Sequence, residues 1–308
     1  MRQEAMGTPD MIGIDWGTSS FRAFLMGSNG QEFDQFSSAD GLLAVRDRAF
    51  GAVLQKTCGA WLAHWPDLKV IMCGMVGSQS GWRDAGYLDG NARVQDLAAA
   101  LVPVQTDTHG VDIRLVPGIK GQDFAGRPDV MRGEETILMG ALSQGMPATS
   151  VVCQPGTHPK WVPVQEGNIS RFATFMTGEL FAMLCNHSIL TPLIIEASTN
   201  CDDAFREGLA MASSTSDVAH QLFSLRAGVL TGADKAETLA DRLSGLLIGS
   251  ELNAVAAQGL LDQPVTLISD GALASRYELA LINAGVSFSK RSAEACCKQG
   301  LAEVFARA

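Results

Sequence analysis

A short apolar run, Met11-Ile12-Gly13-Ile14, ends at Asp15, and a glycine turn leads from there into a second apolar run, Phe21–Met26. The turn is Asp15-Trp16-Gly17-Thr18-Ser19. Glycine lets the chain turn tightly, so that several backbone amides can point at one anion, and the hydroxyls of Thr18 and Ser19 add donors. Asp15 can hold a hydrated Mg²⁺ beside phosphates. The five residues alone are typical of an ordinary turn, but their place between two strands favours a phosphate site.

The residues that follow predict a β-β-β-α-β order. Ser28-Asn29-Gly30 indicates a hairpin turn, because Asn-Gly tolerates positive φ, and residues 31–36 then return as a third strand. Apolar residues repeat at three-and-four spacing from Phe50 to Trp65, which predicts a helix packed on a sheet. Residues 69–73 are a fourth, buried strand.

A similar order begins again near residue 150. The predicted strands are residues 150–153, 161–164, 169–175 and 265–268, and the predicted helices begin at Met176 and cover much of 204–261, 273–284 and 293–306. The second half is thus interpreted as a diverged copy of the first. We therefore expect an α/β chain with two domains, residues 10–145 and 146–308, and a terminal helix at 293–306 that packs near a hinge.

Composition narrows the function classes. The chain has 308 residues, 46% apolar and 18% charged, which suits a globular protein with sizeable cores. Its net charge of -10 argues against a nucleic-acid partner, although a phosphorylated ligand stays compatible with it. The seven cysteines lack ligand spacing and are expected to be reduced. Neither a signal peptide nor a long apolar run is evident, so we expect a cytoplasmic protein without a membrane segment.

The turn of the second unit, Gln154-Pro155-Gly156-Thr157-His158, occupies the place that Asp15–Ser19 holds in the first. Two such turns could clamp opposite sides of a polyphosphate, with Gly156 and Thr157 in contact with it. A proline-glycine turn by itself is typical of an ordinary loop. His158 and Lys160 could contact phosphate or be solvated hairpin residues, and the sequence leaves both open.

Arg132-Gly133-Glu134-Glu135 precedes an apolar helical pattern. Glutamates in a first helical turn can simply offset the helix dipole. The functional hypothesis is that Glu134, or else Glu135, accepts the proton of an attacking hydroxyl. Arg132 could then pair with a substrate carboxylate.

A glycine-rich loop, residues 74–82, follows the fourth strand, at a usual ligand position in α/β sheets. The candidate substrate-binding residues there are Met75, Gly77, Ser78 and Trp82. Gly271, after the strand at 265–268, could let an adenine lie close to the backbone. Each of these two signals is weak when taken alone.

Together these segments resemble the 2-dehydro-3-deoxygalactonokinase family. The matching stretches are Ile14–Ser19, Gly74–Ser78, Val130–Thr136, Pro155–Val162, Phe175–Leu180, Asn186–Ser188, Leu246–Glu251 and Leu273–Tyr277. They run in order over nearly the whole chain, which makes the set specific, although the Asp-x-Gly-Thr turn alone is shared across a superfamily.

The resemblance implies an actin-like ATPase (ribonuclease H-like) fold, with a mixed sheet and flanking helices in each domain and the active site in the cleft between them. It implies transfer of the γ-phosphoryl group of ATP, with Mg²⁺, to the 6-hydroxyl of 2-dehydro-3-deoxy-D-galactonate. Asp15–Ser19 and Pro155–His158 would be the two phosphate turns. Gly249 and Gly271 would lie near the adenosine.

The sequence departs from related sugar kinases at two points. Most of them use aspartate where Glu134 and Glu135 stand, and a common Gly-Gly is replaced by Ser269-Asp270-Gly271. Two alternatives stay open: a kinase for another sugar or sugar acid, and a non-catalytic ATP-binding regulator with the same fold. A polyphosphate or nucleotide hydrolase is a third, but it would not need a carboxylate-binding arginine. The oligomeric state, including a homo-oligomer, is not determined by the sequence.

Overall fold

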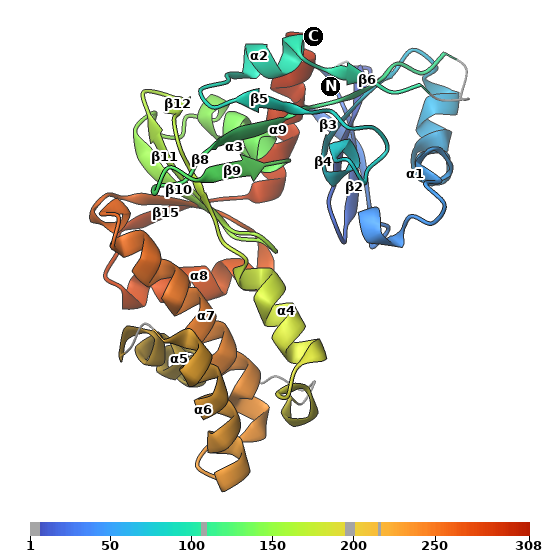
Figure 1. Ribbon diagram of the computed structural model, residues 1–308. Helices are drawn as coiled ribbons and strands as arrows, with labels where there is room; N and C mark the ends of the chain where they lie inside the picture. The colour runs from blue at the N-terminus through green and yellow to red at the C-terminus, as the bar shows by residue number, and fades with distance from the viewer. Residues whose placement is uncertain (1–6, 106–109, 195–200, 215–216) are drawn as a thin grey trace, which may run out of the picture. The chain divides into compact units, whose positions relative to one another are not determined.

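A computed structural model describes residues 7–105, 110–194, 201–214 and 217–308. The chain forms two compact units (Figure 1). Unit 1 comprises Met1–Thr149, Val164–Arg171 and Arg291–Ala308, and unit 2 comprises Ser150–Pro163 and Phe172–Lys290. The last helix, expected in the second domain, belongs by its contacts to unit 1.

Unit 1 is built on a six-stranded sheet of order β3-β2-β1-β4-β7-β6. The strands are β1 (Met11–Trp16), β2 (Phe21–Met26), β3 (Glu32–Ser38), β4 (Lys69–Gly74), β6 (Val102–Pro103) and β7 (Ile113–Leu115). β1, β2 and β3 are antiparallel neighbours, while β4 pairs in parallel with both β1 and β7. The predicted β-β-β-α-β order is confirmed, with α1 (Phe50–His64) between β3 and β4.

The central strands of this sheet are buried because helices cover both faces. α1 contributes Phe50, Leu54 and Cys58 to a core that contains Ile12 and Val70 from the strands. On the other side α9 (Ala293–Phe305) contacts β1 and β4. α9 also packs on α3 (Glu134–Ser143). A strand buried on both faces needs a continuous apolar run, and this explains the sequence of β1.

A three-stranded sheet of order β5-β8-β9 completes unit 1, with α2 (Val94–Ala99) nearby in the chain. Its strands are β5 (Tyr87–Asp89), β8 (Gly118–Gln122) and β9 (Pro128–Met131). β9 ends directly before Arg132, so this sheet leads the chain into the first turn of α3. Two 3-10 turns, η1 (Leu42–Ala44) and η2 (Met75–Gly77), follow β3 and β4.

Unit 2 has a sheet in which β11, β10, β14 and β15 are successive neighbours, and β13 pairs with β11. The strands are β10 (Ser150–Gln154), β11 (Lys160–Gln165), β13 (Ala173–Thr174), β14 (Val265–Ile268) and β15 (Phe288–Arg291). The short strand β12 (Asn168–Ile169) belongs to the segment that is counted with unit 1. β10 and β14 pair in parallel, as β1 and β4 do, so the expected likeness of the halves extends to strand pairing. The single strand predicted for 169–175 is wrong: β12 and β13 are separate, and exposed polar residues at 170–171 lie between them.

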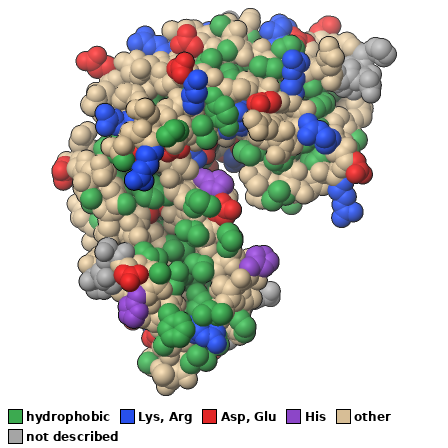
Figure 2. Space-filling view, in the orientation of Figure 1, with side chains coloured by type: hydrophobic (Ala, Val, Ile, Leu, Met, Phe, Trp, Pro, Cys, Tyr) green, Lys and Arg blue, Asp and Glu red, His purple; other side chains and the backbone are tan. Residues whose placement is uncertain are grey.

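The rest of unit 2 is helical, as predicted for 204–261. Its helices are α4 (Thr177–His187), α5 (Asp202–Ser214), α6 (Val218–Thr231), α7 (Leu239–Ala256) and α8 (Gly271–Asn283), with 3-10 turns η3 (Thr191–Leu193), η4 (Ala236–Thr238) and η5 (Leu260–Asp262). Leu225, Leu243 and Leu246 form part of their buried core. Figure 2 shows apolar side chains on the surface of this helical part, where Met183 and Phe223 are exposed.

Two expectations concern the whole described chain. All seven cysteines are free thiols, and five of them are buried, as expected for reduced core residues. None of the described helices combines the length and the apolarity needed to cross a bilayer.

Candidate active site

The first candidate region lies in unit 1, where the ends of β1 and β4 meet the first turn of α3. Gly74 ends β4 with φ 90°, and a Cβ there would lie 2.8 Å from the carbonyl oxygen of Trp16 and 3.3 Å from Asp15 Oδ1. Gly133, with φ 102°, is equally close: its Cβ would lie 3.1 Å from the Cα of Gly74. Two glycines therefore allow α3 to begin beside Asp15.

Asp15 is paired with an arginine that the sequence analysis did not single out. Asp15 and Arg22 are opposite each other in the β1–β2 pairing, and Arg22 Nη2 lies 2.5 Å from Asp15 Oδ2. Burial opposes the charge of Arg22, but the neighbouring Asp15 raises the pKa of its guanidinium overall. Within the described structure Arg22 Nε is buried without a hydrogen-bond partner. Counting residues outward from the turn between β1 and β2 places Arg22 opposite Asp15, and this is the signal by which the sequence could have identified it.

Several backbone groups of the predicted first phosphate turn, Asp15–Ser19, are already hydrogen-bonded within the protein. The amide of Gly17 donates to the carbonyl of Ser20 at 2.9 Å, so this amide is used within the turn and does not point at an anion. Carbonyl groups of Gly17 and Thr18 accept from the amides of Leu42 and Leu43, which fixes the turn against η1. Ser19 is exposed and Thr18 half-buried, so their hydroxyls can still reach a ligand.

Arg132 brings a buried cation to this region. Its side chain is 4% exposed, its Nη2 donates to the carbonyl of Gly86 at 3.0 Å, and its guanidinium lies over the ring of Tyr87. Among the described residues Nε and Nη1 have no hydrogen-bond partner, and neither does the buried hydroxyl of Ser78. Gly77 is close, because its Cβ would lie 3.1 Å from Nη1. Three unpaired buried polar atoms therefore gather here, which is costly unless a ligand satisfies them.

The two glutamates at the start of α3 have different surroundings. Glu134 is half-buried, and its Oε2 accepts the backbone amide of Arg132 at 2.9 Å. Glu135 is fully buried and accepts the Gly133 amide at 2.7 Å and the Thr136 hydroxyl at 2.9 Å. Burial, and then the charge of Glu134, raise the pKa of Glu135 to about 7. Of the two, Glu134 is the carboxylate that a substrate could contact.

The other two predicted substrate residues lie beside β4. Met75 is the first residue of η2 and is half-buried. Trp82 stacks on Phe50 with ring centroids 6.0 Å apart and meets the edge of Trp16 at 6.5 Å. Its ring thus packs against the core of unit 1, as an aromatic residue with a structural role does.

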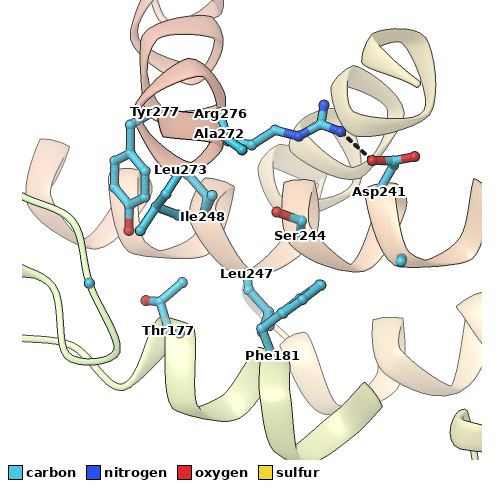
Figure 3. A pocket seen from close by; sticks show the side chains of 13 residues that line it. Thr177, Phe181, Asp241, Ser244, Leu247, Ile248, Ala272, Leu273, Arg276 and Tyr277 are labelled. Carbon is cyan, nitrogen blue, oxygen red and sulfur yellow. Dashed lines mark hydrogen bonds and ion pairs between the residues drawn. The ribbon is translucent and has the colours of Figure 1, made fainter. Parts of the chain in front are cut away.

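The second candidate region is a pocket in unit 2, formed by α4, α7 and α8 together with the turn after β10 (Figure 3). Its volume is about 360 Å³. The lining residues are Gly156, Thr177, Gly178, Phe181, Ala240, Asp241, Ser244, Leu247, Ile248, Ala272, Leu273, Arg276 and Tyr277. Walls that are mainly apolar, with a few polar groups among them, are typical of sites for small molecules and cofactors.

The predicted second phosphate turn forms one end of this pocket through Gly156. Lys160, which is 4% exposed, donates from its Nζ to the carbonyl of His158 at 2.9 Å. His158 Nε2 lies 2.6 Å from Glu179 Oε2. The amide of Glu179 also donates to the carbonyl of Thr157, at 3.0 Å. Lys160 and Glu179 therefore support the turn from within the protein, while His158 remains partly exposed beside it.

Two glycines predicted near the adenosine differ in position. Gly271 begins α8 with φ 66°, directly before the pocket residues Ala272 and Leu273. Gly249 is turned away: a Cβ there would lie 2.8 Å from the Cβ of Ala212, on α5. The structure therefore brings Gly271 next to the pocket and does not bring Gly249 to it.

Several pocket residues were not identified from the sequence. Phe181 comes from α4, and Asp241 and Ser244 come from α7, whereas Arg276 on α8 lies within the Leu273–Tyr277 stretch that resembles the family. Figure 3 shows the Arg276 guanidinium paired with the Asp241 carboxylate. A carboxylate and an arginine 35 residues apart on two helices give no local sequence signal.

Comparisons with known proteins agree with one another. The sequence model of the family 2-keto-3-deoxy-galactonokinase matches residues 15–304. A probable 2-dehydro-3-deoxygalactonokinase of Rhizobium meliloti is 36% identical over 292 residues, which are 94% of each chain. The 2-dehydro-3-deoxygalactonokinase of Escherichia coli is 33% identical over 298 residues, 96% of this chain and 98% of its own.

Solved structures give the same picture. A crystal structure of a protein assigned as a 2-dehydro-3-deoxygalactonokinase, from Sinorhizobium meliloti, matches with a TM-score of 0.82 at 34% identity and covers 96% of this chain and 97% of its own. An activator of 2-hydroxyisocaproyl-CoA dehydratase from Clostridium difficile, solved with bound ADPNP, matches at 12% identity with a TM-score of 0.52, covering 96% and 94%. The second likeness concerns the fold alone. The expected actin-like ATPase fold is confirmed.

Proposed function

The chain belongs to the 2-keto-3-deoxy-galactonokinase family, and from that premise we propose that it transfers the γ-phosphoryl group of ATP to the 6-hydroxyl of 2-dehydro-3-deoxy-D-galactonate. It is an ATP-dependent sugar-acid kinase, and what we add are the residues that perform the transfer. The observation that carries this proposal is the buried Arg132, whose Nε and Nη1 have no hydrogen-bond partner in the described part of the chain and whose backbone amide binds Glu134. The next residue, Gly133, packs on Gly74, which lies beside Asp15.

Arg132 is proposed to bind the carboxylate of the sugar acid. A buried guanidinium with unpaired N–H groups is unfavourable, and a carboxylate supplies charge-assisted acceptors for them. The unpaired hydroxyl of Ser78 and the approach of Gly77 to Nη1 support a ligand at this point. Asp84 Oδ1 lies 3.9 Å from Nη2, so the cation already has one ion-pair partner, while Nε and Nη1 keep no hydrogen-bond partner among the described residues. A substrate carboxylate would add a charged acceptor at this point, and for that reason we expect acids to be preferred over neutral sugars.

Glu134 is proposed to accept the proton of the 6-hydroxyl. Its Oε2 accepts the backbone amide of Arg132, two residues earlier. This hydrogen bond ties the proposed proton acceptor to the residue that is proposed to bind the substrate carboxylate. Glu134 lies in the first turn of α3, at the positive end of the helix dipole. Glu135, which is fully buried, would support the turn that carries Glu134.

Asp15 and Arg22 are proposed to face the phosphates together with Thr18 and Ser19. In phosphoryl transfer the protein mainly supplies positioning and countercharge, and Arg22 would provide such charge at the γ-phosphoryl oxygens. Among the described residues no group of three or more His, Cys, Asp or Glu could hold a metal. Mg²⁺ is commonly bound by one or two carboxylates, substrate phosphates and water, and Asp15 would be the carboxylate here. When bound, Mg²⁺ would neutralise developing charge on the phosphates.

The pocket of unit 2 is proposed to hold the adenosine of ATP. Its apolar walls, among them Phe181 and Leu247, suit a flat purine, and its Gly156 end would receive the phosphates. Gly156, Thr157 and His158 would contact the phosphates, and Gly271 would let the base lie near the start of α8. The free thiols of the chain support a reducing compartment, so we propose that the reaction takes place in the cytoplasm.

A panel of acceptors tests the proposal. Purified protein, ATP and Mg²⁺ are incubated with 2-dehydro-3-deoxy-D-galactonate, its C4 epimer, D-galactonate and D-galactose, and the phosphorylated product is identified by mass spectrometry and NMR. We expect the highest kcat/KM for 2-dehydro-3-deoxy-D-galactonate and a 6-phosphate product. Equal or better use of D-galactose would contradict carboxylate binding, and nucleotide binding without any transfer would favour the regulator alternative.

A further inference from the structure

Glu251 is a buried carboxylate in the middle of α7, 2% exposed, that hydrogen-bonds to three other elements of unit 2. Trp161 on β11 donates its indole N–H to Glu251 Oε1 at 2.7 Å. Thr177 at the start of α4 donates its hydroxyl to Oε2. Tyr277 on α8 donates its hydroxyl to the same carboxylate, at 3.0 and 2.9 Å from the two oxygens. The two oxygens of a carboxylate together offer enough lone pairs to accept all three of these hydrogens.

Two of these donors line the nucleotide pocket, whereas Glu251 itself does not. Thr177 and Tyr277 both project toward the pocket in Figure 3. Burial raises the pKa of Glu251 to about 7, and the three donors oppose that rise. The carboxylate therefore lies directly behind the pocket wall and holds residues from two of its helices.

The same carboxylate is linked to the second phosphate turn. Next to Thr177, Gly178 touches the turn: a Cβ on it would lie 2.4 Å from the carbonyl oxygen of Gly156 and 2.8 Å from the Cα of Thr157. Trp161 follows this turn at the start of β11. Glu251 thus holds the strand that leaves the turn and the helix end that packs on it.

We infer that Glu251 is a positioning residue for the nucleotide: it fixes the Gly156–Thr157 turn and the Tyr277 wall in the geometry that binds ATP. The inference rests on the proposed function, since it takes the pocket of unit 2 to be the ATP site. In Glu251→Gln one oxygen becomes an NH₂ group, which cannot accept from the donors that face it. The hydroxyl that faces this NH₂ group, that of Thr177 or Tyr277, must then accept instead of donate, and its own hydrogen loses the carboxylate acceptor.

The test is a comparison of nucleotide and sugar-acid parameters in Glu251→Gln. We expect KM for ATP, and the Kd of the ATP analogue AMP-PNP measured by calorimetry, to rise about 10- to 100-fold, the scale of a lost hydrogen bond to a charged group. We expect KM for the sugar acid to stay within about twofold, because Arg132 and Ser78 belong to unit 1.

Asn253→Ala is the matched control. Asn253 lies on the same helix, and its side-chain amide donates to the carbonyl of Ala212 at 2.9 Å, away from the pocket residues. This variant should lower the melting temperature and leave the Kd for AMP-PNP unchanged. If Glu251→Gln does not fold, Thr177→Val removes one donor alone, and it should weaken AMP-PNP binding in the same selective way.

Two results would overturn the inference. One is a variant at 251 or 177 that is destabilised like the control but binds AMP-PNP as tightly as the wild type. The other is an equal rise of KM for ATP and for the sugar acid. Failure of the proposed function looks different: the wild type would bind AMP-PNP but phosphorylate no sugar acid, while the calorimetric comparison would still report on Glu251.

Discussion

Arg22 and Asp15 form an ion pair across the hairpin of β1 and β2, with 2.5 Å between Arg22 Nη2 and Asp15 Oδ2. The pair follows from strand geometry, because the four-residue turn between β1 and β2 brings the two positions opposite each other. Both side chains are mostly buried, which strengthens their interaction compared with a surface pair. The aspartate proposed to hold Mg²⁺ is therefore oriented before any nucleotide arrives.

Asp15→Asn should lower kcat by about 100-fold or more, the scale expected when an electrostatic group of an active site is lost. Asparagine keeps the size of the side chain but loses the charge. The measurement is a steady-state assay over a range of Mg²⁺ concentrations, with circular dichroism as the control for folding. Turnover close to that of the wild type at saturating Mg²⁺ would show that Asp15 has no such role.

Arg22→Gln should also lower kcat, again by about 100-fold, if the guanidinium offsets charge on the transferred phosphoryl group. Arg22→Lys should recover part of the activity, since it restores the charge without the planar donor geometry. Because KM for the sugar acid should change little, initial rates at varied sugar-acid concentration separate this role from substrate binding. If Arg22→Gln keeps a normal kcat, Arg22 does not act on the phosphoryl group, and its role is only to orient Asp15.

Arg132→Met should raise KM for the sugar acid by about 10- to 100-fold and leave KM for ATP nearly unchanged, because it removes charge-assisted hydrogen bonds to the carboxylate. Arg114→Met is a matched control, since Arg114 pairs with Asp112 on the surface of the same unit. The assay varies each substrate separately. Equal effects of the two substitutions would contradict a carboxylate site at Arg132.

Much of the fold could be predicted from the sequence because unit 1 begins with local signals. Each of these signals is a short, unbroken stretch of sequence that predicts one element by itself. They are the apolar runs of β1 and β4 and the Asn29-Gly30 turn. The start of α3 was predicted with the correct residues for the same reason. By contrast, the strand expected at 169–175 is interrupted, because exposed polar residues at 170–171 end β12 after two residues.

The parts of the site that were missed depend on contacts between distant segments. Arg22 is a candidate only once its register opposite Asp15 is known. Gly249 was expected at the adenosine, but its neighbour Ile248, and not Gly249, lines the pocket that we propose for the adenosine. Consecutive residues on a helix point about 100° apart, so an error of one position turns a side chain from the pocket toward α5. Whether α7 presents residue 248 or 249 is decided by packing, which the sequence does not show.

Because Glu135 is buried and has a raised pKa, we expect the free energy of unfolding to depend on pH. Its pKa is about 7 in the folded protein and 4.5 in its ordinary state, so its contribution is fully present at low pH and is lost as pH rises through 7. Glu251, also at about 7, acts in the same direction. Urea unfolding should show wild-type stability falling from pH 5 to pH 8. Glutamine does not titrate, so the difference in free energy of unfolding, variant minus wild type, should rise by ~2 kcal/mol from pH 5 to pH 8 in Glu135→Gln.

A constant difference between Glu135→Gln and the wild type across this pH range would contradict the raised pKa. The converse change, in which the wild type gains stability on the variant as pH rises, would mean that the carboxylate is stabilised in its ionised form. Glu303→Gln serves as a comparison, because Ser143 and other hydrogen-bond partners lower the pKa of Glu303. Its stability difference from the wild type should stay nearly constant from pH 5 to pH 8 and change only below pH 5.

The most direct measurement compares the rate of phosphoryl transfer in Glu134→Gln and Glu135→Gln, with the Kd of AMP-PNP measured for both. Glu134 is half-buried, hydrogen-bonded to the amide of Arg132, and proposed to take the proton of the 6-hydroxyl. We predict that Glu134→Gln loses about 100-fold or more in kcat, while its nucleotide affinity stays unchanged. Glu135→Gln should keep most of its turnover. If Glu135→Gln loses turnover and Glu134→Gln keeps it, the base has been assigned to the wrong carboxylate, and if both keep it, the base is not at the start of α3.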